Sequence, residues 1–313
     1  MNVLLCGQMP ASELASWRTA LTEAMPDARW LDLDAARSAS TTVRAAVVAN
    51  PMPGALVGLP ALQLVQSLWA GVDRLLADAT VPAQLPIARM VDPAMNAAMA
   101  ETALWAALSL HRGFFAYAQR QREGVWHAHA QRRADEVTVL VLGLGEMGRA
   151  AAARIQQQGY RLLGWRRRDG SMVDGIESHS GGAALPALLP RADVLINLLP
   201  LTPDTRGLLD RTLFAALPRG AAIVNLARGA HIVDEHLLDA LDRGHLSHAV
   251  LDVFQTEPLP SHHRYWTHPA VTVLPHAAAL TDARSAAAVV ATNLRALRDG
   301  RPLMFVVDRQ RSY

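Results

Sequence analysis

The stretch that decides the fold is Val137-Thr138-Val139-Leu140-Val141-Leu142-Gly143-Leu144-Gly145-Glu146-Met147-Gly148. Its first half is a short apolar run, typical of a buried strand, and its second half fits the pattern G-x-G-x-x-G. An alanine-rich helical segment follows at once. In such a strand–turn–helix unit Gly143 permits the tight turn, Gly145 lets the backbone approach a pyrophosphate, and Gly148 lets helix and strand pack closely. The helix start, with Glu146 and Met147, would direct backbone amides at the phosphates. The alternative is a glycine-rich turn in an unliganded α/β domain.

Short apolar runs alternate with helical stretches outward from this unit. The runs predict strands at 3–6, 46–49, 62–66, 137–142, 161–165, 193–198, 222–226, 249–253 and 271–274, and the stretches predict helices at 146–157, 234–242 and 282–298. Runs of β-branched residues and leucine suit parallel strands covered on both faces. The repeated βα alternation, in a chain of 313 residues, predicts an α/β protein with doubly wound parallel sheets in two domains.

The segment 96–122 is alanine-rich, free of proline, and interrupted only by Gly113. We predict one long helix here that links the two domains. Its apolar and aromatic residues would either make a homodimer contact or pack on the sheet of their own domain; the aromatic ones are Trp105, Phe114, Phe115 and Tyr117.

Composition excludes several classes of protein. The chain is 51% hydrophobic and 19% charged with a net charge of +2, so it can build a large core and is a poor nucleic-acid binder. Cys6 is the only cysteine, which excludes internal disulfides and cysteine metal clusters, and we expect no metal site. There is no lysine, so Schiff-base chemistry and a P-loop are excluded. We find no signal peptide and no membrane-spanning run, and expect a cytoplasmic protein with no membrane partner.

The residues after the predicted strand 161–165 indicate which dinucleotide is bound. An NAD site would offer an acidic residue near this point for the ribose hydroxyls. The chain offers Arg166, Arg167 and Arg168 instead. Guanidinium groups bind a 2′-phosphate bidentately, so the sequence favours NADP(H) over NAD(H). The alternative is a solvated basic turn.

Three further segments close predicted strands, and each carries one chemically active side chain. Asn225-Leu226-Ala227-Arg228-Gly229 carries an arginine, Asp252-Val253-Phe254-Gln255-Thr256-Glu257-Pro258 a glutamate, and Leu274-Pro275-His276 a histidine. Ligand sites in open α/β sheets lie beyond the carboxyl ends of the strands. Each residue alone has an ordinary structural explanation, but together they predict one catalytic rim formed by Arg228, Glu257 and His276.

These motifs resemble the D-isomer-specific 2-hydroxyacid dehydrogenase family over essentially the whole chain. The stretch Leu199-Pro200-Leu201-Thr202-Pro203-Asp204-Thr205 adds to the resemblance. Within the family the chain looks most like the glyoxylate/hydroxypyruvate reductase A branch, on the short spacing from Glu257 to His276 and the terminal stretch 307–313. The resemblance implies a flavodoxin-like substrate-binding domain of residues 1–97 and 286–313. It also implies a Rossmann NAD(P)-binding domain of residues 98–285, with a cleft between the two.

The resemblance also implies roles for the site residues. Arg228 would hold the carboxylate and carbonyl oxygen of a 2-oxo acid, His276 would exchange a proton with the carbonyl oxygen, and Glu257 would favour the protonated histidine. The implied product is a D-2-hydroxy acid. Besides the loop at 143–148, the positions implied to contact the cofactor are Trp165, Arg166, Arg167, Leu199, Pro200, Thr205, Leu226, Ala227 and Asp252.

For the substrate-binding domain, Leu68-Trp69-Ala70-Gly71-Val72-Asp73 resembles the family segment whose amides bind the substrate carboxylate, which predicts Ala70 and Gly71 as substrate contacts. Near Ala49 the branch carries a tryptophan, so this chain could accept a larger 2-oxo acid unless Trp69 fills the space. The sequence also leaves open a dehydrogenase of the same fold that acts on formate or phosphite, and a non-catalytic dinucleotide-sensing protein.

Overall fold

The computed structural model describes residues 1–168, 173 and 175–310. The chain divides into two compact units, unit 1 with Met1–Met95 and Thr281–Tyr313, and unit 2 with Asn96–Leu280. Helix α4 (Pro93–His111) contains the first of these boundaries.

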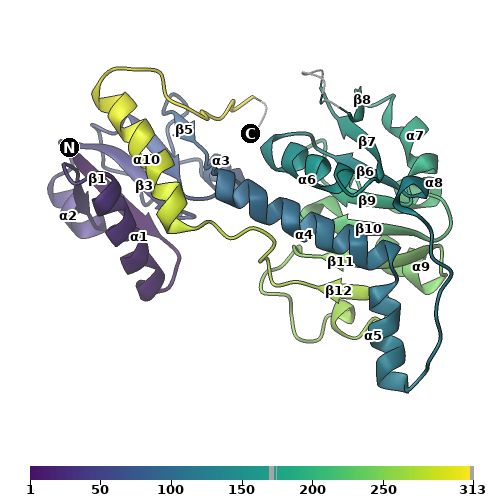
Figure 1. The fold of residues 1–313 in the computed structure, drawn as a ribbon. Helices are drawn as coiled ribbons and strands as arrows, with labels where there is room; N and C mark the ends of the chain where they lie inside the picture. Colours follow the sequence, from purple (N-terminus) through teal and green to yellow (C-terminus); the bar gives the residue numbers. More distant parts are fainter. Residues whose placement is uncertain (169–172, 174, 311–313) are drawn as a thin grey trace. The chain divides into compact units, whose positions relative to one another are not determined.

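Unit 1 is built on a parallel five-stranded sheet in the order β2-β1-β3-β4-β5. Its helices α1 and α10 pack together although they come from opposite ends of the chain (Figure 1). The C-terminal tail is tied to the same unit, since Arg309 Nη2 donates hydrogen bonds to the carbonyl oxygens of Pro82 and Leu85. The elements are β1 (Asn2–Gly7), α1 (Ala11–Ala24), β2 (Arg29–Leu31), α2 (Leu33–Ser38), β3 (Val43–Ala49), β4 (Leu64–Ser67), α3 (Asp73–Ala77), β5 (Ile87–Ala88) and α10 (Ala283–Arg298).

Unit 2 is built on a parallel seven-stranded sheet in the order β12-β11-β10-β9-β6-β7-β8. Its strands are β6 (Thr138–Leu142), β7 (Arg161–Arg166), β8 (Glu177–Ser180), β9 (Val194–Asn197), β10 (Ala221–Asn225), β11 (Leu246–Leu251) and β12 (Val271–Val273). Its helices after α4 are α5 (Phe114–Glu123), α6 (Glu146–Gln156), α7 (Leu185–Leu188), α8 (Arg211–Ala216) and α9 (Asp234–Asp242), with short 3₁₀ helices η1 (Ala134–Glu136), η2 (Leu189–Arg191), η3 (Gly229–His231) and η4 (Arg264–Trp266).

The strand order of unit 2 reverses at β6. The next strand along the chain, β7, lies on one side of β6, and β9 lies on the other. In open α/β sheets ligands bind at this switch point, outside the carboxyl ends of the strands. The predicted doubly wound architecture is confirmed, and it puts the loop after β6 beside the loop after β9.

Alternate residues of the central strands supply two separate cores. Leu140 and Leu142 belong to a cluster with residues of α7, α8 and α9, whereas Val139 and Val141 belong to a cluster with residues of α4 and α6. Successive side chains of a strand point to opposite faces. The sheet is therefore covered on both faces, as the nearly continuous apolar strands predict.

The single long helix predicted over 96–122 is wrong. The structure has α4 and α5 instead, separated at Gly113, whose φ of +70° lies in the left-handed region. A residue in that conformation ends a helix, and glycine adopts it without a steric penalty. The break lets Phe115 of α5 stack on His248 of β11 with ring centroids 4.5 Å apart.

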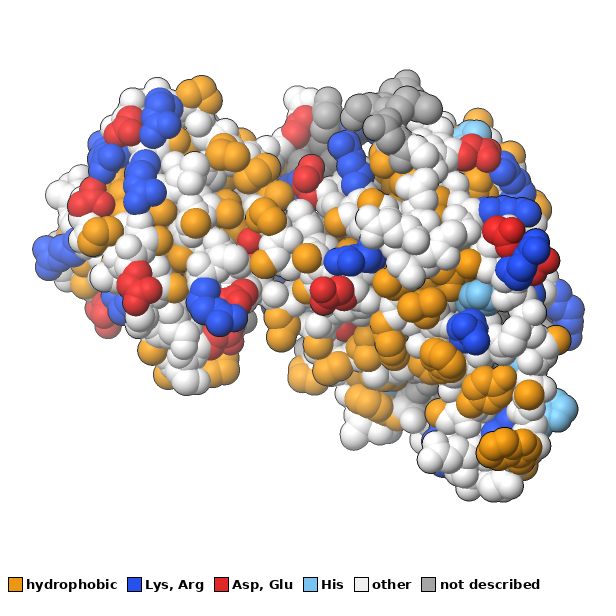
Figure 2. All heavy atoms as spheres, viewed as in Figure 1, with side chains coloured by type: hydrophobic (Ala, Val, Ile, Leu, Met, Phe, Trp, Pro, Cys, Tyr) orange, Lys and Arg blue, Asp and Glu red, His pale blue; other side chains and the backbone are white. Residues whose placement is uncertain are grey.

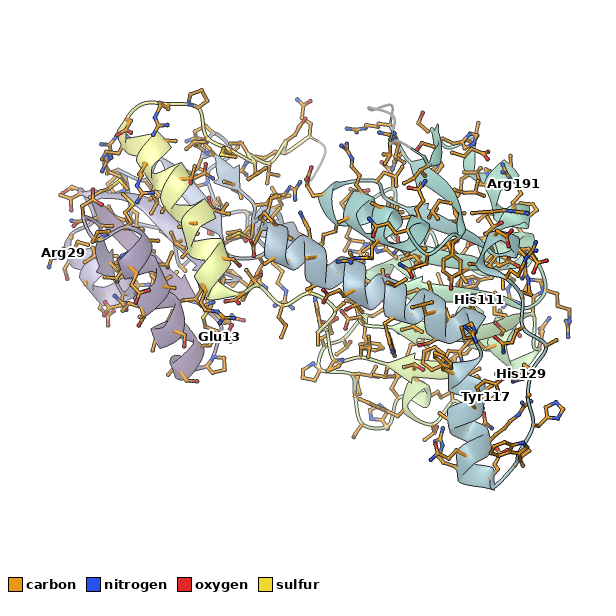
Figure 3. All side chains as sticks on the ribbon, viewed as in Figure 1. Glu13, Arg29, His111, Tyr117, His129 and Arg191 are labelled. Atoms are coloured by element: carbon orange, nitrogen blue, oxygen red, sulfur yellow. The ribbon has the colours of Figure 1, made fainter. Side chains whose placement is uncertain are left out.

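The aromatic residues of α4 and α5 divide into two groups. Trp105 and Phe114 are 41% and 52% exposed, and hydrophobic side chains gather over these two helices on the face that Figure 2 shows. Phe115 and Tyr117 are half-buried, and the Tyr117 ring lies beside His129 of the segment that returns along α5 (Figure 3). Only Trp105 and Phe114 of the four thus remain well exposed.

No helix among the described residues combines the length and the apolar character needed to cross a membrane.

Candidate active site

The loop after β6 has the steric properties of a dinucleotide-binding turn. A Cβ at Gly143, whose φ is +94°, would lie 2.6 Å from the Leu198 carbonyl oxygen in the loop after β9. A Cβ at Gly148 would lie 1.8 Å from the Gly143 carbonyl oxygen. Both positions need glycine for packing, whereas a Cβ at Gly145 would meet nothing within 4 Å. Gly145 caps the N-terminus of α6, so open space adjoins the helix end that attracts anions.

The loop after β9 is held by its own side chains. Thr205 is 2% exposed, and its hydroxyl donates a hydrogen bond of 2.8 Å to the Pro200 carbonyl oxygen. Leu199 is 5% exposed, and its N–H donates to Asn197 Oδ1 at 3.2 Å. The predicted cofactor residues Leu199, Pro200 and Thr205 thus belong to one compact loop beside the switch point.

The predicted residues at the end of β7 have different surroundings. Trp165 is 3% exposed, and its indole N–H donates to the Gly181 carbonyl oxygen at 2.9 Å, so its side chain belongs to the core. Arg166 ends the strand and is half-buried. Arg167 Nη1 pairs with Asp204 Oδ2 at 2.6 Å, which joins this turn to the loop after β9. Asp169, the first acidic residue after the arginines, lies outside the described residues.

The histidine and the glutamate of the predicted catalytic rim are in direct contact. His276 Nδ1 lies 2.7 Å from Glu257 Oε2, and Glu257 Oε1 accepts a hydrogen bond of 2.9 Å from the Phe254 N–H. Burial disfavours ionisation of Glu257, but the hydrogen bonds from His276 and Phe254, with the charge of Arg228, hold the pKa of this carboxyl below its usual value. An ionised carboxylate therefore contacts the imidazole.

Gly229 brings the arginine loop to this pair. A Cβ at Gly229 would lie 1.9 Å from the carbonyl carbon of Phe254. The loop after β10 therefore packs directly on the backbone of the loop after β11, and only glycine fits at the contact. Sequence reasoning did not assign this role, although the glycine that follows the arginine in Arg228-Gly229 was the available signal.

Asp252 fixes the loop that carries the histidine. Its carboxylate accepts hydrogen bonds from the N–H groups of Ala277 at 2.7 Å and Ala278 at 3.1 Å, and its carbonyl oxygen accepts one from the His276 N–H at 2.9 Å. His276 itself has a φ of +55°. A non-glycine residue in this region is held there by its surroundings and is a common feature of functional sites.

Two wholly buried asparagines join the loops after β9 and β10, and sequence reasoning missed this function for both. Asn197 Nδ2 donates to Asn225 Oδ1 at 2.9 Å, and Asn225 Nδ2 donates to the Arg228 carbonyl oxygen at 3.0 Å. Asn225 Oδ1 also accepts a hydrogen bond of 3.3 Å from the Ala227 N–H. Leu226 and Ala227, both predicted to contact the cofactor, are buried between Asn225 and Arg228 in the loop after β10.

The predicted substrate contacts Ala70 and Gly71 belong to unit 1, where they follow β4 and are half-buried. Trp69 lies edge-to-face against Trp17 of α1, with ring centroids 6.3 Å apart. Ala49 is completely buried, so its methyl group lines no exposed surface of this unit.

Among the residues that the structure describes, no group of three histidine, cysteine, aspartate or glutamate side chains is placed to hold a metal ion.

The family model described as "D-isomer specific 2-hydroxyacid dehydrogenase, NAD binding domain" matches residues 104–278, more than half of the chain. The chain belongs to the D-isomer specific 2-hydroxyacid dehydrogenase family. It is thus an NAD(P)-dependent oxidoreductase, and the matched residues 104–278 lie within unit 2.

Relatives and solved structures agree with this assignment along the whole chain. Glyoxylate/hydroxypyruvate reductase A from Serratia proteamaculans is 37% identical over 98% of both chains. The D-isomer specific 2-hydroxyacid dehydrogenase from Xanthobacter autotrophicus Py2, solved with NADPH and MES, matches with a TM-score of 0.93 at 36% identity, covering 100% of this dehydrogenase and 99% of that chain. The NADPH-dependent glyoxylate/hydroxypyruvate reductase from Sinorhizobium meliloti, solved with NADP and sulfate, matches with a TM-score of 0.92 at 34% identity, covering 100% and 99%.

Proposed function

We propose that this dehydrogenase reduces a short 2-oxo acid to the D-2-hydroxy acid with NADPH, and that glyoxylate and hydroxypyruvate are its first candidate substrates. The single observation that carries the proposal is the contact of 2.7 Å between His276 Nδ1 and an ionised Glu257, with Arg228 acting on the same carboxylate. Relatives named for glyoxylate and hydroxypyruvate reduction support the choice of substrate.

The proposed roles follow from the chemistry of the three side chains. Glu257 engages Nδ1 of His276, so Nε2 is the nitrogen that gives a proton to the carbonyl oxygen as it becomes a hydroxyl. The negative charge of Glu257 stabilises the imidazolium before the transfer. Arg228 holds the substrate carboxylate because its guanidinium is permanently charged and forked. Within unit 1, the backbone at Ala70 and Gly71 stays a predicted substrate contact.

The residues of the β6–β9 switch point fit a dinucleotide. The open space at Gly145 and the N-terminus of α6 suit a pyrophosphate, and Arg166 and Arg167 suit a 2′-phosphate. When bound, NADPH supplies the hydride that reduces the carbonyl carbon. We assign Glu146, Met147, Leu199, Pro200, Thr205, Leu226, Ala227 and Asp252 to the same cofactor site, and Trp165 to its support from the core.

A spectrophotometric screen of short 2-oxo acids with NADPH and with NADH tests the proposal. We expect turnover of glyoxylate or hydroxypyruvate, with a higher kcat/KM for NADPH than for NADH. His276→Ala is the control for activity from contaminating enzymes. The absence of turnover of every 2-oxo acid by a folded, NADPH-binding protein would refute the proposed function.

We also propose a homodimer formed through α4 and α5. Its support is the exposure of Trp105 and Phe114 beside half-buried Leu104 and Leu108 on these helices, because exposed apolar clusters of this kind mark interaction sites. We expect light scattering after size exclusion to give a dimer mass, and Trp105→Arg to convert the protein to a monomer. Trp266→Arg is the matched control, since that tryptophan is 51% exposed on η4. A monomeric wild-type protein would contradict the proposed homodimer.

The cytoplasmic location of the protein stays a prediction.

A further inference from the structure

His231, in η3, is wholly buried between the loops after β9 and β10. Its Nδ1 lies 3.1 Å from the Arg228 carbonyl oxygen, and its Nε2 lies 3.3 Å from the Pro200 carbonyl oxygen. Both ring nitrogens therefore face acceptors, one in the loop assigned to the substrate and the other in a loop assigned to the cofactor.

The protonation state of His231 limits what the ring can donate. Burial has the largest effect and lowers the pKa of His231. The two carbonyl contacts oppose it in part, and the smaller effects of the Arg228 and Arg206 charges lower the pKa further. The neutral imidazole has one N–H, so it donates to only one of the two carbonyl groups.

The surrounding hydrogen bonds indicate which of the two carbonyl groups accepts the single ring N–H of His231. The Arg228 oxygen already accepts hydrogen bonds from Asn225 Nδ2 at 3.0 Å and from the His231 backbone N–H at 3.2 Å, which use both lone pairs of a carbonyl. The Pro200 oxygen accepts one other hydrogen bond among the described contacts, from the Thr205 hydroxyl. A lone pair on Pro200 is thus open to Nε2–H.

We propose that His231 is a positioning residue, and that its Nε2–H donated to the Pro200 carbonyl oxygen fixes the cofactor loop relative to the Arg228 loop. The inference rests on the proposed function for the roles of these loops. It extends that function because the described hydrogen-bond contacts of the His231 ring are to backbone carbonyl groups, and because His231 belongs to none of the motifs that predicted the site.

Two amide variants separate the two contacts of the ring. In His231→Gln the side-chain amide nitrogen lies near the position of the imidazole Nε2. In His231→Asn the side-chain amide nitrogen lies near the position of Nδ1. We expect His231→Gln to stay within about threefold of the wild type in kcat/KM, and His231→Asn to lose about tenfold, which corresponds to about 1.4 kcal/mol. We expect the Kd for NADPH to rise in the same order. Similar melting temperatures of the two variants would show that the difference is not one of folding.

Equal kcat/KM values for the two variants, whether both retained or both lost, would overturn the proposal. The tautomer of the wild-type protein gives a second test that needs no activity. Nitrogen NMR of ¹⁵N-histidine-labelled protein, assigned by the signal missing in His231→Gln, should show the proton on Nε2, and a proton on Nδ1 would refute the assignment. A wild-type protein without 2-oxo acid turnover would refute the proposed function, but the tautomer and the Kd for NADPH would still test His231.

Discussion

At the active site, Nδ1 of His276 is 2.7 Å from Glu257 Oε2, and the second oxygen of that carboxylate is bound to the Phe254 N–H. The carboxylate is thus fixed from both sides, and its charge favours the imidazolium. Reduction needs His276 protonated, so it should decline on the alkaline side of the pH profile, whereas oxidation of the 2-hydroxy acid should increase there.

Glu257→Gln keeps the shape of the side chain and removes its charge. Since the imidazolium then loses its stabilising partner, we expect the alkaline limb of the reductive kcat/KM profile to move to lower pH. We use kcat/KM because it reports the ionisation of the free enzyme. A superimposable profile would show that Glu257 does not affect His276, and a shift to higher pH would show that the charge effect has the opposite sign.

Arg228→Ala and His276→Ala should separate chemistry from cofactor binding. We expect each variant to lose at least about 100-fold in kcat/KM, because anchoring and proton donation act on the 2-oxo acid. The Kd for NADPH, measured by fluorescence titration, should change by less than about threefold in both. Loss of cofactor binding together with activity would show that the roles are wrongly assigned.

The strand-end motifs of the sequence predicted Arg228, Glu257 and His276, because each contains a chemically distinctive side chain after an apolar run. The residues that hold the loops together were not predictable in the same way. His231 and Gly229 contact the backbone of a neighbouring loop, and Asn197 donates to the Asn225 side chain on the neighbouring strand. Such contacts depend on the sheet order rather than on local sequence.

Among the elements, the buried strands were predictable because apolar runs mark them, and β6 and β7 begin or end within one residue of the predictions. The missed strands β2, β5 and β8 are short or polar, and β8 reads Glu177-Ser178-His179-Ser180 at a sheet edge. The break at Gly113 was visible in the sequence only as a glycine. The stacking of Phe115 on His248, a tertiary contact, accompanies the turn into α5.

The His248 contact that anchors α5 to β11 should make stability depend on pH. Burial, assisted by the charge of His268, lowers the pKa of His248 to about 4 from 6.5. The unfolded chain therefore binds more protons between these values, so this group contributes stability above about pH 6.5 that is lost as pH falls toward about 4. The loss is at most about 3 kcal/mol.

His248→Gln removes the titration but keeps a polar group toward Thr272, whose Oγ1 lies 2.9 Å from His248 Nε2. We expect urea unfolding to give a smaller loss of stability in this variant than in the wild type between pH 6.5 and pH 4. His262→Gln, at an exposed histidine, is the matched control and should follow the wild type. Parallel curves for His248→Gln and the wild type would contradict the prediction.

For the whole molecule, the chain order explains why one unit was easier to interpret than the other. Unit 2 is a continuous segment with the dinucleotide turn directly after its first strand, so its motifs follow one another along the sequence. Unit 1 combines both ends of the chain, and α10 packs on α1 more than 250 residues earlier. The sequence predicted this assembly only through the resemblance to the family.

Cofactor binding should stabilise the whole folded chain and show which dinucleotide it prefers. A ligand that binds only the folded state adds about 2.7 kcal/mol at about 100 times its Kd. We expect NADPH to raise the midpoint of thermal unfolding more than NADH at the same concentration, because guanidinium groups at Arg166 and Arg167 favour a 2′-phosphate. Replacing both arginines by alanine should remove the difference, whereas Arg161→Ala, at the exposed start of β7, should preserve it. Equal stabilisation of the wild type by the two nucleotides would refute the preference for NADPH, and a difference that survives in the double variant would place its origin outside the turn after β7.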